Sequence, residues 1–172
     1  AYTLDIAPDH IQIGSSTCGG VFNGLQQLFR LLPPEVYARR GIAPGTGIAC
    51  VRIEDKPRFG YRGMMLDVAR TWIGMDEVKR YIDLFSYHNI NKLHLHLSDD
   101  EGWRIEILSH PELTEIGGFR GGDSPVRPVY GKWSEKYGGY FKQSKMRELI
   151  RYAALRNIEI IPEIDLPGHS RN

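Results

Sequence analysis

The sequence is poor in cysteine and contains no long apolar run. Its two cysteines among 172 residues, Cys18 and Cys50, are too few for a disulfide framework and lack the short spacing of a zinc site. A pairing between them stays open, but we expect two buried thiols. No window approaches the about 18 consecutive apolar residues of a membrane-spanning helix, and no basic region followed by an apolar run at the N-terminus indicates a signal peptide. We therefore expect no membrane span.

An excess of one charge is also absent. The chain has 22 Lys and Arg against 21 Asp and Glu, a formal net charge of +1. This balance gives no summed field that would attract the polyanionic backbone of nucleic acid or an acidic membrane surface, so neither is an expected partner. Hydrophobic residues make up 41% of the chain and charged residues 25%, which predicts a globular protein with a buried core.

The N-terminal third of the chain predicts a small α+β domain. Alternating apolar residues in Tyr2–Ile6 and Ile11–Ile13, with a Pro-Asp turn between them, are typical of a β-hairpin. Helical spacing predicts an amphipathic helix at residues 18–32 with Thr17 as its N-cap, and a further strand follows at Ile48–Ile53. The helix is expected to present one apolar face made of Val21, Leu25, Leu28, Phe29 and Leu32.

Strands and helices alternate after residue 57. Strands are predicted at Met64–Val68, Leu93–Leu97 and Ile158–Ile164, and helices at Met75–His88 and around Met146–Ala153. A Gly-rich stretch, residues 101–140, separates the second strand from the second helix. The βαβαβ order requires a parallel sheet, and strands dense in Leu, Ile and Met predict burial on both faces, as in a barrel or a doubly wound sheet. An eight-stranded barrel needs about 250 residues, so we expect the front part of something longer.

Polar residues follow each of these three strands. Reacting groups of α/β proteins collect where parallel strands end, so Arg70, Asp99, Asp100 and His169 are expected around one mouth. An aspartate beside a histidine fixes the tautomer of the ring and raises its basicity, which favours a proton-handling pair of Asp99 and His169. A structural ion-pair network is the alternative. Asp100 is expected to point away from Asp99, because successive strand residues face opposite sides.

Two further features near the mouth have competing interpretations. Arg70 either holds a polar ligand through its fork of donors or clamps a carboxylate such as Asp67. His94 and His96 share one face of their strand, as in an H-x-H metal motif. For these histidines we favour the alternative, in which inward-facing rings are satisfied by hydrogen bonds.

The flanking residues are interpreted as structural. The indole of Trp103 either stacks on the apolar face of a sugar or packs under the long loop, and packing is the favoured reading. Glu163 and Asp165 share a face, and we expect both to form buried salt bridges to Arg62 or Arg70.

Three segments together resemble one enzyme family. Residues 62–70 (RGMMLDVAR), 94–104 (HLHLSDDEGWR) and 162–169 (PEIDLPGH) are similar to motifs of the β-N-acetylhexosaminidases of glycoside hydrolase family 20, in the same order. Residues 138–141 (GGYF) also match. The resemblance implies an α/β fold, in which a small α+β domain at residues 1–56 precedes the first three strands of an incomplete (β/α)8 TIM-type barrel at residues 57–172.

The resemblance also implies an activity. The family removes terminal N-acetylglucosamine or N-acetylgalactosamine from glycans or chitin oligomers with retention, using the 2-acetamido oxygen of the substrate as nucleophile, and no metal or cofactor is implied. Arg70 would grip the 3- and 4-hydroxyls of the sugar. Asp99 would pair with His169 behind the general acid and tune it.

The chain departs from the family in two respects. The general acid is normally the Glu of a later Asp-Glu pair, and the aromatic residues that line the sugar pocket also come later; no matching pair occurs before Asn172. Glu101 stands where the family usually has Gln, so it either shifts nearby pKa values or points to solvent. We therefore expect the front portion of an exo-hexosaminidase that is inactive by itself, with an open barrel edge that favours self-association.

Two alternatives from other classes remain. The chain is a structural or carbohydrate-binding module completed by a partner or by self-association, or it is a metal-dependent hydrolase built on His94, His96 and Asp99. Members of the family are commonly exported, periplasmic or lysosomal, but these residues give no evidence for a compartment. They also do not determine which glycan is the natural substrate.

Overall fold

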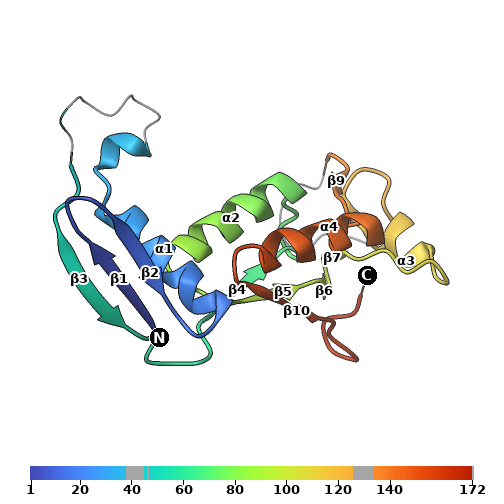
Figure 1. Ribbon diagram of the computed structural model, residues 1–172. Helices are drawn as coiled ribbons and strands as arrows, with labels where there is room; N and C mark the ends of the chain where they lie inside the picture. The colour runs from blue at the N-terminus through green and yellow to red at the C-terminus, as the bar shows by residue number, and fades with distance from the viewer. Residues whose placement is uncertain (38–44, 46, 126–133, 172) are drawn as a thin grey trace. The chain divides into compact units, whose positions relative to one another are not determined.

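The computed structural model describes residues 1–37, 45, 47–125 and 134–171 (Figure 1). The chain divides into two compact units, which are described one at a time. The first comprises Ala1–Gly60 with Tyr87–Asn89, and the second comprises Tyr61–Ser86 with Ile90–Asn172. In the described ranges, no helix combines the length and the apolar character needed to cross a bilayer.

The first unit contains a three-stranded antiparallel sheet in the order β2-β1-β3. Its strands are β1 (Tyr2–Ile6), β2 (Ile11–Gly14) and β3 (Val51–Asp55). The predicted hairpin is present, but the third strand begins three residues later than expected and continues to Asp55. In the central strand, Leu4 pairs with Ile13 on one side and Ile53 on the other. It is fully buried and forms the centre of the small apolar core.

Helix α1 (Cys18–Leu31) begins as the sequence predicts. The side chain of Thr17 accepts a hydrogen bond from the backbone N–H of Gly20 at 3.1 Å, which satisfies one of the free donors of the first turn. The helix ends at Leu31, and a short 3-10 helix, Pro34–Val36, follows.

The buried face of α1 differs from the expected one. Leu28 packs against the core, whereas Val21, Leu25 and Phe29 are exposed in the described structure. The reason is close approach: a Cβ atom on Gly24 would lie 2.6 Å from Cγ2 of Ile13, so the helix meets the sheet through its glycine-bearing side. The spacing of the apolar residues predicted the helix correctly. It did not predict which face is buried, because the close approach at Gly24 sets that face.

The expectation of two buried thiols is wrong. Cys18 and Cys50 are both free and exposed. Cys18 is the first residue of α1, and Cys50 lies immediately before β3, so neither side chain reaches the apolar core of its unit.

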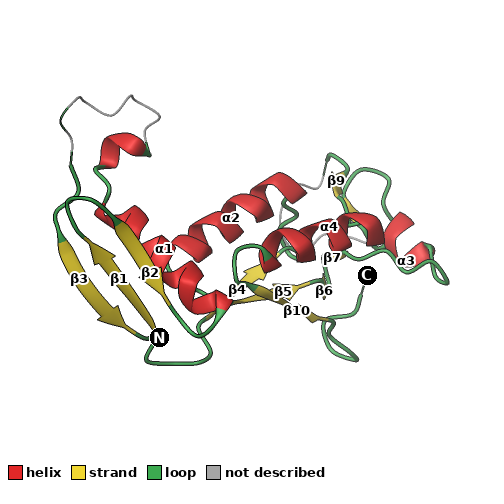
Figure 2. Cartoon of the chain, viewed as in Figure 1, coloured by secondary structure: helices red, strands yellow, loops and turns green. Residues whose placement is uncertain are grey.

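The second unit is built on a parallel sheet in the order β10-β5-β4. Its strands are β4 (Gly63–Asp67), β5 (Lys92–His96) and β10 (Glu159–Glu163). Helices α2 (Met75–Tyr87) and α4 (Gln143–Ala154) connect them, and both lie on the same side of the sheet (Figure 2). The predicted βαβαβ order with parallel strands is therefore confirmed.

The core of this unit lies between β5 and the two helices. Leu93 and Leu95 are fully buried and Leu97 almost so. They pack against buried residues of α2 and α4: Val78, Ile82, Phe85, Leu149 and Ala153. Because side chains alternate along a strand, the same register turns His94 and His96 to the opposite face of the sheet.

Burial on both faces, as expected for the strands, does not hold for β4. Met65, which shares a face with His94, is 54% exposed, and Met64 on the helix-facing side of this edge strand is also exposed. Both helices cover the same side of the sheet, so among the described residues the opposite face of this edge strand has no cover.

The Gly-rich stretch contains several short elements. They are β6 (Ser98–Asp99), β7 (Gly102–Trp103), α3 (Glu112–Glu115), β8 (Phe119–Arg120) and β9 (Tyr137–Gly138). Strands β6 and β7 pair antiparallel, and so do β8 and β9. Residues 126–133, which belong to the same stretch, lie outside the described residues.

Replacing Leu95 by Ala should destabilise the second unit by about 2–5 kcal/mol, because the fully buried side chain is surrounded by packed neighbours that cannot close the resulting cavity. Urea unfolding monitored by circular dichroism measures the change. Leu155→Ala is the matched control, since Leu155 is exposed, and it should change the free energy of unfolding by no more than about 0.5 kcal/mol. Equal effects of the two substitutions would contradict the assigned core.

Candidate active site

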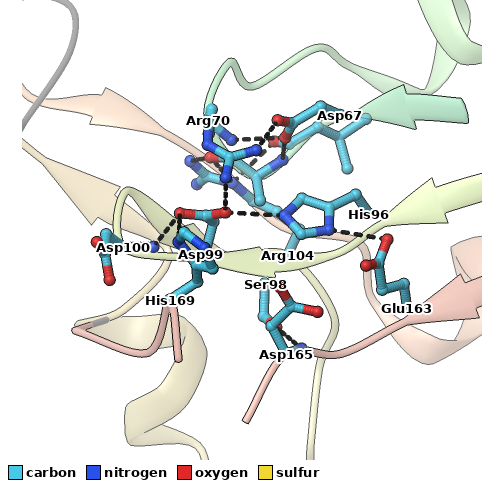
Figure 3. A network of polar contacts seen from close by, with 12 residues as sticks. Asp67, Arg70, His96, Ser98, Asp99, Asp100, Arg104, Glu163, Asp165 and His169 are labelled. Carbon is cyan, nitrogen blue, oxygen red and sulfur yellow. Dashed lines mark hydrogen bonds and ion pairs between the residues drawn. The ribbon is translucent and has the colours of Figure 1, made fainter. Parts of the chain in front are cut away.

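The register of the parallel sheet brings the ends of its three strands to one level. Asp67 at the end of β4 pairs with His96 of β5, and Glu163 of β10 pairs with the same His96. The segments that continue from these strands carry Arg70, Asp99 and further polar groups into one network (Figure 3). The expected convergence of polar residues at this edge is therefore present.

Asp99 is the centre of this network. Its side chain is almost completely buried, and Oδ2 lies 3.0 Å from Nε2 of His96 and 2.5 Å from Nη2 of Arg70. Its Oδ1 accepts the backbone N–H of Asp100 at 2.7 Å and lies 3.5 Å from Nδ1 of His169. Burial alone would raise the pKa of Asp99, but the hydrogen bonds from His96 and Asp100 and the charge of Arg70 outweigh burial and lower it. Asp99 is therefore ionised.

The predicted pair of Asp99 and His169 is the weakest of these contacts. His169 is more than half exposed and approaches Asp99 only to 3.5 Å, whereas His96 is buried and lies closer. Sequence reasoning favoured a His96 ring satisfied by hydrogen bonds, which agrees with this contact, but did not identify His96 as the nearest histidine to Asp99. The signal was available in the spacing, since a residue that ends a strand and one three positions later can meet across the turn.

Arg70 is held in place by two carboxylates. Its Nη1 donates to Oδ2 of Asp67 at 2.7 Å, while Nη2 pairs with Asp99. The other oxygen of Asp67 accepts the backbone N–H groups of Ala69 and Arg70 at 3.1 and 2.9 Å, which fixes the turn that follows β4. The hydrogen bond to Asp67 raises the pKa of Arg70. Its side chain is 36% exposed, so a guanidinium with five N–H donors can clamp these carboxylates and still offer donors to a ligand.

His96 lies between two carboxylates. In addition to its contact with Asp99, its Nδ1 is 2.9 Å from Oε2 of Glu163, an ion-pair contact rather than an aligned hydrogen bond. Burial alone would lower the pKa of His96, but Asp99 and Glu163 outweigh burial and raise it. Likewise, burial favours the neutral form of Glu163, but His96 and His94 lower its pKa.

The expected salt bridges from Glu163 and Asp165 to Arg62 or Arg70 are not formed between these residues in the part of the chain that the structure describes. Oε2 of Glu163 lies 2.6 Å from Nε2 of His94 as well as contacting His96. The backbone N–H of Asp165 donates to Oγ of Ser98 at 2.9 Å. The register explains the difference. Glu163 on β10 pairs with His96 on β5, whereas Arg70 lies beyond the end of β4.

The residues proposed as metal ligands do not converge as one set. Two other sets of three residues each place their potential ligand atoms within 4.8 Å of one another. One is His96, Glu163 and Asp165, and the other is Asp99, Asp100 and His169. In the described structure His94, His96 and Asp99 form no such group. Both ring nitrogens of His96 face carboxylate oxygens, which is the arrangement of a proton donor rather than of a lone-pair ligand.

Arg104 connects the segments around the site. Its guanidinium is buried and donates to backbone carbonyl groups of four separate segments: Val68 and Ala69 after β4, Glu101 before β7, Gly118 before β8, and Gly139 after β9. Burial lowers its pKa to about 10, so it stays charged at neutral pH. Since Val68 and Ala69 directly precede Arg70, this residue fixes the backbone from which Arg70 extends. Sequence reasoning missed it.

Trp103 packs under the loop, as the favoured interpretation predicted. Its indole is buried, and its N–H donates to the carbonyl oxygen of Ile105. This leaves no ring face for a sugar in the described structure.

Glu101 is a buried carboxyl group, not a solvent-facing one. Only 3% of the residue is exposed, and within the described residues neither of its carboxylate oxygens has a hydrogen-bond partner. Burial raises its pKa, and the charges of Asp99 and Asp100 raise it further, whereas Arg70 acts in the opposite direction. The expected shift of pKa near the mouth therefore falls on Glu101 itself.

The chain is similar to known proteins over nearly its whole length. Residues 59–172 match glycosyl hydrolase family 20, catalytic domain. A β-hexosaminidase from Vibrio furnissii is 43% identical over 99% of this chain and 27% of the relative, and an N,N'-diacetylchitobiase from Vibrio harveyi is 39% identical over 99% of this chain and 19% of the relative. The chain therefore spans about a quarter or less of these relatives.

Two solved structures are similar as well. One is a GH20 exo β-N-acetylglucosaminidase from Vibrio harveyi in complex with N-acetylglucosamine, with a TM-score of 0.91, 42% identity, and coverage of 99% of this chain and 26% of that one. The other is a Streptomyces plicatus N-acetyl-β-hexosaminidase, with a TM-score of 0.86, 44% identity, and coverage of 98% and 32%.

Replacing Glu101 by Gln should stabilise the protein near neutral pH. In the folded state the pKa of Glu101 is raised above its unfolded value of about 4.3. Below that pH the carboxyl group is protonated in both states and costs no stability. As the pH rises through the folded pKa, the group ionises while buried and the protein loses stability. Gln has no such proton to lose. The free energy of unfolding should therefore exceed that of the wild type by about 1–3 kcal/mol near neutral pH, with the gain disappearing below about pH 4.

Urea unfolding at several pH values measures this difference. Glu115→Gln is the control, since Glu115 is exposed on α3 and the same chemical change there should leave the pH dependence as it is. A Glu101→Gln variant whose stability runs parallel to that of the wild type at all pH values would contradict a buried, titrating carboxyl group.

Proposed function

The chain belongs to glycosyl hydrolase family 20, and from this premise we propose that it forms part of an exo-β-N-acetylhexosaminidase that hydrolyses terminal N-acetylglucosamine or N-acetylgalactosamine. One observation carries the proposal. Arg70 is held by Asp67 and Asp99 at the carboxyl edge of a parallel sheet, with donors left for a ligand, and His169 lies near Asp99. Such an edge is where α/β enzymes bind their substrates.

The proposed architecture follows the same premise. The strands β4, β5 and β10 would be the first three of a (β/α)8 barrel, and residues 1–56 a small α+β domain that precedes it. Support comes from the parallel order of these strands and from the similarity to solved family members of which this chain covers only 26% and 32%. In a barrel, the free hydrogen-bonding edges of the two outer strands, β4 and β10, would each pair with a further strand.

The proposed roles of the site residues follow from their chemistry. The guanidinium of Arg70 would donate to the 3- and 4-hydroxyls of the terminal sugar, for which a planar fork is suited. The 2-acetamido oxygen of the substrate would bond to the anomeric carbon as the glycosidic bond breaks, and water would then open this ring with overall retention. Asp99 and His169 would lie behind the general acid that protonates the leaving oxygen.

A second candidate is supported by the exposed side of β4. Met65 lies open on the face of this strand that is opposite the helices, the face that also carries His94 on the neighbouring strand. An uncovered apolar face of this kind favours association, so the chain would act as a structural or sugar-binding module completed by a partner or by a second copy of itself.

Hydrolysis of 4-nitrophenyl N-acetyl-β-glucosaminide by the gene product that carries this chain tests the proposed function. Asp99→Asn should lower kcat/KM by about 100-fold or more, because it removes the charge that orients Arg70 and stabilises a positive site. Arg70→Lys should lower it similarly, since an ammonium group does not reproduce the fork. Asp9→Asn, an exposed matched control, should leave kcat/KM unchanged. Absence of cleavage by the wild type would contradict the proposal.

The 172-residue chain by itself should cleave no aryl N-acetylglucosaminide, because the general acid expected for this family has no counterpart in it. The same assay on the purified chain measures this, with the longer gene product as the positive control. Turnover by the chain alone would show that an acid within these residues suffices. Sedimentation of the same preparation would separate the two candidates, since the second requires an assembly.

A further inference from the structure

A continuous series of charged contacts connects β10 to Arg70. Nε2 of His94 lies 2.6 Å from Oε2 of Glu163, and the same oxygen lies 2.9 Å from Nδ1 of His96. The other ring nitrogen of His96 is 3.0 Å from Oδ2 of Asp99, and that oxygen is 2.5 Å from Nη2 of Arg70. Figure 3 shows the inner part of this series, from Glu163 through His96 and Asp99 to Arg70.

The protonation state of His96 follows from what faces it. An ionised carboxylate only accepts hydrogen bonds, and its negative charge favours a proton on a ring nitrogen that lies beside it. His96 presents both nitrogens to carboxylates, Glu163 on one side and Asp99 on the other, and its side chain is 4% exposed. The two flanking carboxylates thus favour the imidazolium form of the ring, in which the buried positive charge is balanced by a negative charge at each end.

We propose that Glu163 is a positioning residue: by holding His96 as an imidazolium, it keeps Asp99 ionised and aimed at Arg70 and His169. Glu163 contacts neither Arg70 nor His169 itself, so it acts through His96. The inference rests on the proposed function, in which Arg70 binds the sugar, and it adds a group on β10 to the residues on which that binding depends.

Other charged groups also face this series. The groups around Glu163 and His96, other than Asp99, are His94 on β5, Asp165 after β10 and Asp67 at the end of β4. Those around Asp99 are Arg70, His169, Asp100 and Glu101. Among all of these, Glu163 is the only carboxylate within ion-pair distance of Nδ1 of His96 in the part of the chain that the structure describes. Its charge is therefore the one that decides whether that nitrogen keeps its proton.

The substitution Glu163→Gln removes this charge and preserves the shape of the side chain. Nitrogen-15 chemical shifts of the His96 ring, measured in this chain as a function of pH, report its protonation directly. The midpoint for His96 should fall by about one pH unit or more, because one of its two anionic neighbours is lost. Carbon-13 shifts of the Asp99 carboxyl group should show its midpoint rising in the same variant, since the cationic partner is then lost near neutral pH.

Two matched variants serve as controls. Glu163→Asp keeps the charge with a shorter side chain and should keep His96 cationic. Glu159→Gln makes the same chemical change four residues earlier on β10, where the glutamate is exposed and pairs with Lys92, and it should move neither midpoint. A structural role for Glu163 would predict loss of stability in both position-163 variants, with no selective change at His96.

Kinetics of the gene product that carries this chain give the functional readout. Relative to the wild type, the kcat/KM of Glu163→Gln should fall about tenfold further at about pH 8 than at about pH 5, because His96 in the variant is still protonated only at the lower pH. Glu163→Asp should follow the pH profile of the wild type. A loss that is uniform across pH would overturn the inference, and so would unchanged midpoints of His96 and Asp99.

Failure of the proposed function gives a different result. If the wild type cleaves no aryl N-acetylhexosaminide, that function is wrong, while the titrations of His96 and Asp99 in this chain still decide whether Glu163 controls the charge of Asp99. If the wild type is active and the titrations of Glu163→Gln match those of the wild type, the function stands and the inference is wrong.

Discussion

The register of β5 between β4 and β10 is the constraint on which the rest of the second unit depends. It sends Leu93, Leu95 and Leu97 to the helices and His94 and His96 to the other face. Sliding one strand by a single residue would exchange these faces, burying imidazoles among leucines and exposing the apolar core. The same register sets the polar ends of the three strands level with one another, so a packing requirement also assembles the site.

Burial of charge around this edge is tolerated because each charge is matched. Asp99 is buried beside two cations, and His96 is buried between two anions. An isolated ion in such a place would cost several kcal/mol in solvation, and a paired one recovers much of that through short contacts in a medium of low polarity. Glu101 is the exception, since its carboxyl group is buried and unmatched, and it responds by a raised pKa rather than by pairing.

Backbone carbonyls balance the charge where carboxylates do not. Arg104 and Arg120 are both buried, and both donate only to carbonyl oxygens in the described structure. A guanidinium distributes its donors in a plane, so one side chain can satisfy several carbonyls that approach from different loops. The segments after β4, after β6, before β8 and after β9 thereby acquire fixed positions without a regular sheet to hold them.

Sequence reasoning grouped three residues of the candidate site but not the contacts among them. Arg70, Asp99 and His169 could be grouped because each follows a strand of a predicted parallel sheet. The pairing of Asp99 with His96, and of Glu163 with both histidines, required the register, which a single sequence does not contain. Arg104 was missed because a buried arginine with backbone partners has the same local sequence pattern as an exposed one.

The sequence by itself determined the order of the longer strands and helices, the N-cap of α1 and the parallel sheet, because apolar periodicity and capping are local properties. Tertiary structure decided which face of α1 is buried, that both cysteines are exposed, and that one side of β4 stays open. These outcomes depend on how closely elements approach and on which side the helices lie. Both are set by packing between segments far apart in the chain, which local pattern does not encode.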